Sequence, residues 1–242
     1  MFPLRDNVPS IRKPYVTIII IVINVIIYAF QWLLPDMLNV RLIYTFGFLP
    51  ARLSESLLNR QVSYPDLLPL LTSMVLHGSW LHLLGNMWIL WLFGDNVEDR
   101  LGHFKFFLFY LLSGVAAMSL HYITNPGSPV PAVGASGAIA GVMGAYFILF
   151  PQARITTLIL IVFIPLFINI PAVVFLLIWF LMQVYSGTIN SLAGGVGGGV
   201  AWWAHIGGFL GGILLLKLMY TGRHRRPVSY DYHWTVSRRY PY

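Results

Sequence analysis

The chain of 242 residues contains no cysteine. It therefore has no disulfide framework, no thiol nucleophile and no thiolate metal site. Charged residues are also scarce, because they make up 10% of the chain while hydrophobic residues make up 57%. A soluble fold of this length could not bury so much apolar surface, so the composition indicates a membrane protein.

Apolar runs of spanning length recur along the chain. Six of them are candidate membrane-spanning helices, at about 15–34, 74–93, 104–122, 135–150, 171–186 and 200–220. A seventh run, 155–170, is broken by Pro165 and rich in β-branched residues, which favours an interfacial or re-entrant segment. The pattern predicts an all-α polytopic membrane protein with six transmembrane helices.

The basic residues indicate how these helices are oriented. All but three of the fifteen Lys and Arg residues fall on the same side as both chain ends, and the exceptions, Arg41, Arg52 and Arg60, lie in the loop from 35 to about 73. The positive-inside rule then predicts cytoplasmic termini and an external loop in a cell membrane. We expect a cytoplasmic N-terminal segment (1–14), a six-helix membrane domain (15–221) and a basic cytoplasmic tail (222–242).

The net charge of +7 fits this orientation. We attribute it to topology and to attraction for anionic membrane lipid, and we expect no nucleic-acid partner, because Lys and Arg are not interleaved with aromatic residues in a soluble domain. The first apolar run lacks a small-residue cleavage motif, so we expect it to be a retained helix. The sequence leaves the oligomeric state open.

A single serine stands among glycines in Gly134-Ala135-Ser136-Gly137, at the start of a predicted helix. There, first-turn N–H groups and the helix dipole favour a developing oxyanion. His205 can take the proton of Ser136 as a general base. His82 and Asn86 are four residues apart, so both can donate to the oxyanion from one helix face. The set predicts a serine hydrolase.

The four side chains lie at a similar depth in the membrane. Counted at 1.5 Å per residue from the cytoplasmic ends of their helices, they lie roughly 14 to 22 Å above those ends. The run 135–150 is short, so it must begin below the outer surface, which predicts an outward-open cavity with Ser136 at its floor. Because no Asp or Glu lies at this depth, we expect a Ser-His dyad rather than a triad.

Small residues predict how the two catalytic helices pack. Gly137, Gly141 and Gly144 form one stripe at helical spacing, which lets another helix approach closely. A matching stripe on the last helix consists of Ala201, His205, Gly208 and Gly212. Packing of the two stripes would bring His205 toward the start of the run 135–150.

Each of these residues also has a plainer interpretation. Ser136 could be a helix N-cap, and His205 could be a structural hydrogen-bonding group. His77, His82 and His205 could be considered as zinc ligands. However, His77 is five residues before His82 and would face elsewhere on a continuous helix, and no carboxylate is nearby. We therefore do not expect a metal site.

The motifs resemble those of the rhomboid family of intramembrane serine proteases, in its six-helix prokaryotic form. The resemblance spans all six predicted helices and includes three motifs on alternate helices and a fourth in the first loop. These motifs are Gly134-Ala135-Ser136-Gly137, His82-Leu83-Leu84-Gly85-Asn86, Ala204-His205-Ile206-Gly207-Gly208 and Gly47-Phe48-Leu49-Pro50.

The resemblance implies the roles of the site residues. Ser136 would attack the scissile carbonyl, His205 would act as base and then as acid, and His82, Asn86 and the Ser136 backbone N–H would form the oxyanion hole. The implied substrates are single-pass transmembrane proteins cut near the external face. The resemblance implies no metal and no organic cofactor. The chain departs from the family at Ala140, where many relatives carry an aromatic residue beneath the histidine, and in lacking a Trp-Arg pair in the first external loop.

Two other functions remain open at this point. One is a catalytically silent rhomboid-like protein that binds transmembrane helices, although a binding role would not require the four polar residues. The other is a proton-coupled transporter that uses His82 and His205, which the lack of an intramembrane Asp or Glu and of an internal repeat disfavours.

Overall fold

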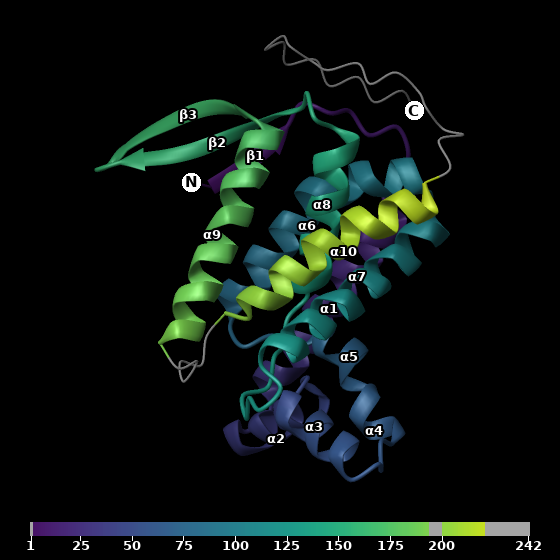
Figure 1. Cartoon of the computed structure of the whole chain (residues 1–242). Coiled ribbons are helices and arrows are strands. Elements are labelled where there is room, and N and C mark those ends of the chain that lie inside the picture. Colours follow the sequence, from purple (N-terminus) through teal and green to yellow (C-terminus); the bar gives the residue numbers. More distant parts are fainter. Residues whose placement is uncertain (1, 194–199, 221–242) are drawn as a thin grey trace.

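The computed structural model describes residues 2–193 and 200–220, and within them the chain is mostly helical (Figure 1). A helix is present at each of the six predicted runs. These helices are α1 (Tyr15–Leu33), α6 (Trp80–Leu101), α7 (His103–Thr124), α8 (Ser136–Leu149), α9 (Ala172–Leu192) and α10 (Trp202–Met219). The predicted tail, 222–242, lies outside the described residues.

The polytopic helical bundle is confirmed, and the helices differ in their ability to span a membrane. By length and hydropathy, α1, α7, α9 and α10 each qualify alone. α6 qualifies together with the segment Tyr64–Val75, from which it is separated by a bend of 79°, and α8 is a shorter apolar helix. The described residues therefore contain four candidate spans, or five if the bent pair is one.

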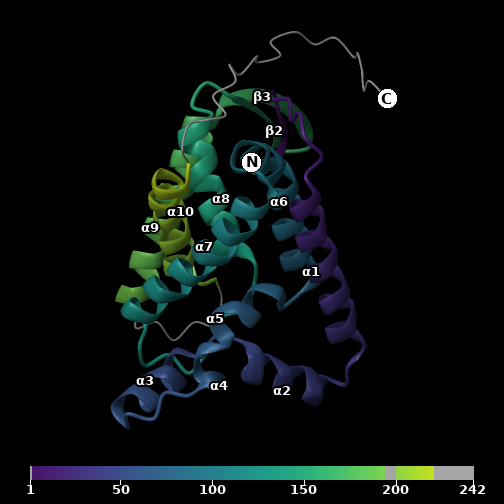
Figure 2. The ribbon, with the colours of Figure 1, turned by 90° about the vertical axis from the view of Figure 1, so that its right-hand side faces the viewer.

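Between α1 and α6 the chain forms several short helices at one end of the bundle, here named the loop end (Figure 2). They are α2 (Asp36–Phe46), α3 (Pro50–Leu58), α4 (Tyr64–Leu67), α5 (Pro69–Thr72) and the 3₁₀ turn η1 (Ser73–Val75). Buried Phe48 exchanges two backbone hydrogen bonds with Ala132, of 2.8 and 3.0 Å. This bridge ties the loop end to the segment that leads into α8.

The opposite end of the bundle, the sheet end, carries a three-stranded antiparallel sheet that the sequence analysis did not anticipate (Figure 1). The run 155–170 forms the hairpin of β2 (Arg154–Ile161) and β3 (Ile164–Pro171), and β1 (Phe2–Asp6), within the predicted N-terminal segment 1–14, pairs with β2. The run 155–170 is rich in β-branched residues, which favour strands over helices, and this explains why it forms a hairpin.

Side-chain hydrogen bonds fasten β1 to the helices. The Trp88 indole donates to the Pro3 carbonyl at 2.7 Å. The Asp6 carboxylate accepts from the Asn96 amide at 2.8 Å and from the hydroxyl of Tyr146 near the end of α8. Burial raises the pKa of Asp6 to about 6, and the bond from Tyr146 opposes that rise. The N-terminal strand is therefore joined to both α6 and α8.

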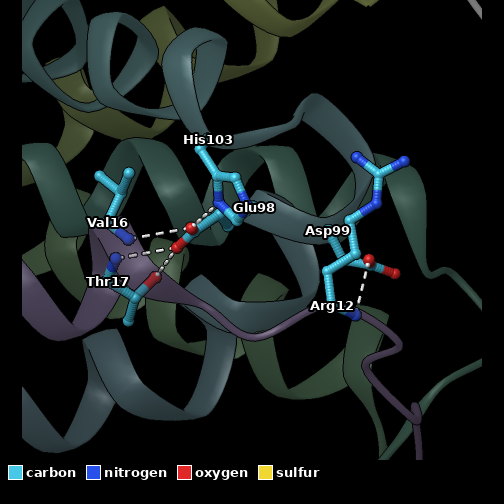
Figure 3. A network of polar contacts seen from close by, with 6 residues as sticks. All are labelled: Arg12, Val16, Thr17, Glu98, Asp99 and His103. Carbon is cyan, nitrogen blue, oxygen red and sulfur yellow. Dashed lines mark hydrogen bonds and ion pairs between the residues drawn. The ribbon is translucent and has the colours of Figure 1, made fainter.

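A buried carboxylate holds the start of α1 against α6. Glu98 accepts hydrogen bonds from the Val16 and Thr17 backbone N–H groups at 2.9 and 2.8 Å and from the Thr17 hydroxyl at 2.7 Å (Figure 3). It also pairs with Nδ1 of His103 at the start of α7. The residue before α1 is Pro14, which has no side-chain oxygen, so Glu98 supplies the cap from another helix.

We expect Glu98→Ala to lower the free energy of unfolding by about 2 to 4 kcal/mol, because several buried donors lose their acceptor together. The measurement is thermal unfolding of the purified protein in detergent. Asp99→Ala is the matched control, since Asp99 accepts one exposed bond of 3.2 Å from the Arg12 N–H. Equal losses in both variants would mean that Glu98 is not the anchor of α1.

Candidate active site

The site is organised around α8, a helix of 14 residues that is buried from Gly137 to Tyr146. α6, α7 and α10 all pack against it. Such burial is possible because α8 consists largely of glycine, alanine and aliphatic residues, so its neighbours can surround it closely. A helix start in this position presents its first-turn N–H groups to protein rather than to lipid.

The predicted packing of small-residue stripes on α8 and α10 is confirmed. A Cβ added at Gly208 would meet the Gly137 carbonyl oxygen, and one added at Gly212 would meet the Gly141 backbone. On the other side, a Cβ at Gly144 would meet the Phe209 carbonyl. The two backbones are therefore in direct contact, which brings the start of α10 alongside the start of α8.

This packing brings Ser136 and His205 together. Ser136 is the first residue of α8, and its Oγ lies 2.8 Å from Nε2 of His205, in the first turn of α10. The N-cap position belongs to Ala135, so capping does not explain the serine. Both side chains are partly exposed. The arrangement pairs a hydroxyl with a base, as nucleophilic catalysis requires.

The imidazole of His205 has further partners that sequence reasoning missed. Its Nδ1 lies 2.8 Å from Oε1 of Gln183, a buried residue of α9. The Trp179 ring lies beside it, with centroids 5.9 Å apart and planes tilted by 35°, and Trp202 meets it edge-on at 6.3 Å. Two indoles thus flank the ring.

His82 and Asn86 lie next to the turn that leads into α8. The His82 ring is so close to Gly134 that a Cβ there would come within 2.7 Å of it, and the same Cβ would be 3.6 Å from the Asn86 amide nitrogen. Gly134 also has a φ of +125°, which L side chains rarely adopt. Both predicted donors therefore lie beside Gly134, two residues before the serine in the chain.

The structure corrects our placement of His77. α6 begins at Trp80, capped by Ser79, so His77 precedes the helix and does not face away from His82. The two rings meet edge-on at 5.1 Å, and Nε2 of His77 lies 3.0 Å from the Asn86 amide nitrogen. His77 thus orients Asn86. Within residues 2–193 and 200–220, no three His, Asp or Glu residues are grouped to hold a metal ion.

Comparison with known proteins agrees with this geometry. Residues 64–222 match the Rhomboid domain, which covers more than half of the chain and includes every site residue named above. The chain belongs to the rhomboid family. The two strands of the β2–β3 hairpin and the histidine that precedes α6 also fall within the matched region.

Several curated rhomboid proteins are similar to the chain over part of its length. It is 35% identical over 101 residues to the human mitochondrial presenilin-associated rhomboid-like protein, which is 41% of this chain and 26% of the relative. It is 40% identical over 83 residues to the yeast mitochondrial Rhomboid protein 1, which is 33% of this chain and 24% of the relative. The chain spans about a quarter of the length of these relatives.

The contact between α8 and α10 gives a test of the rhomboid site's packing. We expect Gly208→Ala to destabilise the protein by about 1 to 3 kcal/mol, because the new methyl group would overlap the Gly137 carbonyl and force the helices apart. Thermal unfolding in detergent measures the loss. Gly85→Ala is the control, since a Cβ there meets nothing within 4 Å. A Gly208→Ala protein as stable as wild type would contradict this packing.

Proposed function

We propose that the protein is an intramembrane serine endopeptidase that cleaves transmembrane segments of membrane proteins. The observation that carries this proposal is the 2.8 Å contact between Ser136 Oγ and His205 Nε2 at the start of a buried helix. A rhomboid-like protein that only binds helices would have no need for a base within hydrogen-bonding distance of a serine.

The proposed reaction follows from these two side chains. Ser136 Oγ attacks the scissile carbonyl carbon while His205 Nε2 takes its proton, which gives a tetrahedral oxyanion. The protonated imidazole then gives that proton to the leaving amine as the peptide bond breaks. Water, deprotonated by His205, hydrolyses the acyl-enzyme ester and returns Ser136 to its starting form.

The oxyanion would be stabilised by donors already gathered around the start of α8. These are the Ser136 backbone N–H, which has no acceptor within its own helix, and the side chains of His82 and Asn86. The His77 contact holds the Asn86 amide in place and still leaves it a second N–H to donate. Such preorganised donors stabilise charge without reorganisation during the reaction.

The distribution of charge supports an orientation and a substrate class. The described basic residues gather at the sheet end, except for Arg41, Arg52 and Arg60 of the loop end. We therefore propose that the sheet end is cytoplasmic in a cell membrane, with both termini on that side. Ser136 and His205 then lie toward the external face, where they would cut single-pass transmembrane proteins.

Replacing the nucleophile gives the direct test of activity. We expect Ser136→Ala to abolish both cleavage of a single-pass substrate and labelling by a fluorophosphonate probe, with mass spectrometry locating the label in wild type. Ser113→Ala is the matched control, because this buried serine lies on α7 and has no role in the proposed reaction. Wild-type cleavage by folded Ser136→Ala would overturn the proposal, and absence of any labelling in wild type would favour a binding protein.

The proposed oxyanion hole predicts a graded loss instead. Asn86→Ala and His82→Ala are each expected to slow turnover by about ten- to a thousandfold, since one donor among several is lost. Asn24→Ala provides the comparison, because that buried amide bonds to the Ile20 carbonyl of its own helix at 2.7 Å. Full activity in both site variants, measured as kcat/KM for the same substrate, would make these two side chains structural.

A further inference from the structure

Two contacts fix the direction of the Gln183 side-chain amide. The Trp179 carbonyl lies 3.1 Å from one end of the amide, and His205 Nδ1 lies 2.8 Å from the other. A backbone carbonyl can only accept a hydrogen bond, so the end that faces Trp179 must be the NH₂ group. The end that faces His205 is therefore the carbonyl oxygen Oε1.

This direction in turn fixes the tautomer of His205. Since Oε1 of an amide only accepts, Nδ1 of the neutral imidazole must carry the proton and donate it to Gln183. Nε2 then holds the lone pair and accepts from the Ser136 hydroxyl at 2.8 Å. The other tautomer would put a proton on Nε2, where it could not act as a base toward the serine.

We propose that Gln183 is a positioning residue that selects this tautomer and ring orientation, so that the site works as Ser136, His205 and Gln183 rather than as a dyad. This inference rests on the proposed protease function. Gln183 is buried, with 5% of its surface exposed. The amide orients the imidazole as a carboxylate does in a soluble triad, but it places no charge in an apolar surrounding, where charge is costly.

The residues around His205 support an orienting role over simple packing. The Trp179 and Trp202 rings limit its tilt, but ring contacts do not decide which nitrogen carries the proton, and a ring that is only packed can still turn over and put carbon atoms where its nitrogens were. Gln183 supplies a directional bond to one nitrogen and is itself held by a bond within α9. It is this polar contact that distinguishes the two nitrogens.

The test measures the rate of Ser136 labelling by a fluorophosphonate probe as a function of pH, with the full chain in detergent. The variants are Gln183→Leu, which removes the acceptor, and Gln183→Glu, which keeps its shape and can add a charge. Thr188→Val is the matched control, because its hydroxyl bonds only to the Val184 carbonyl of α9 among the described contacts, at 2.8 Å. Thermal unfolding checks that each protein is folded.

We expect Gln183→Leu to label at least about tenfold more slowly than wild type at every pH, because the imidazole is no longer held in one tautomer. We expect Gln183→Glu to retain labelling and to raise the pH of half-maximal labelling by about one unit, since a carboxylate stabilises the protonated imidazole. Thr188→Val should match wild type in both rate and pH profile.

The outcomes separate this inference from the proposed function. Labelling of folded Gln183→Leu at the wild-type rate, or a pH profile of folded Gln183→Glu that matches wild type, would overturn the role of Gln183 and leave the protease intact. A wild-type protein in which Ser136 does not react would instead overturn the proposed function. A purely structural glutamine would lower the thermal midpoint in Gln183→Leu without moving the pH profile of Gln183→Glu.

Discussion

The contact between the backbones of α8 and α10 is the constraint on which the site depends. Gly208 lies on the Gly137 carbonyl and Gly212 on the Gly141 backbone, with no side chain between them. Helices held this closely leave little freedom to slide or rotate against each other, so the first turn of α10 stays level with the first turn of α8. Dispersion and weak polar contacts, rather than a hydrophobic driving force, must supply this stability in a membrane.

Several polar side chains of the helical bundle are arranged in chains of partners. Ser136 leads to His205 and Gln183, Asn86 leads to His77, and Glu98 connects the start of α1 to α7. In an apolar surrounding, a polar group without a partner is costly, so each connection also favours one arrangement of helices over others. The same bonds that orient the reacting groups thus help to specify the fold.

The sequence predicted the helices and the small-residue packing because both have a periodic signal, and it predicted the pair Ser136 and His205 because each lies in a short motif with glycines near a helix start. It did not predict Gln183, since we sought only Asp or Glu as the partner of the histidine; the available signal was the first polar residue after a long apolar stretch of α9. It misplaced His77 because the apolar run continues through a 79° bend. The hairpin was missed because its strands are apolar on both faces and lack an alternating pattern.

The position of β1 has a consequence for the order of assembly. Phe2 pairs with Leu158 of β2, so the strand partner of β1 is synthesised only after α1, α6, α7 and α8. Contacts so distant in sequence require a large loop to close, which makes them slow to form. During synthesis, residues 2–6 must therefore remain without their strand partner until β2 has been made. The three-stranded sheet at the sheet end thus forms only after these four helices have been synthesised.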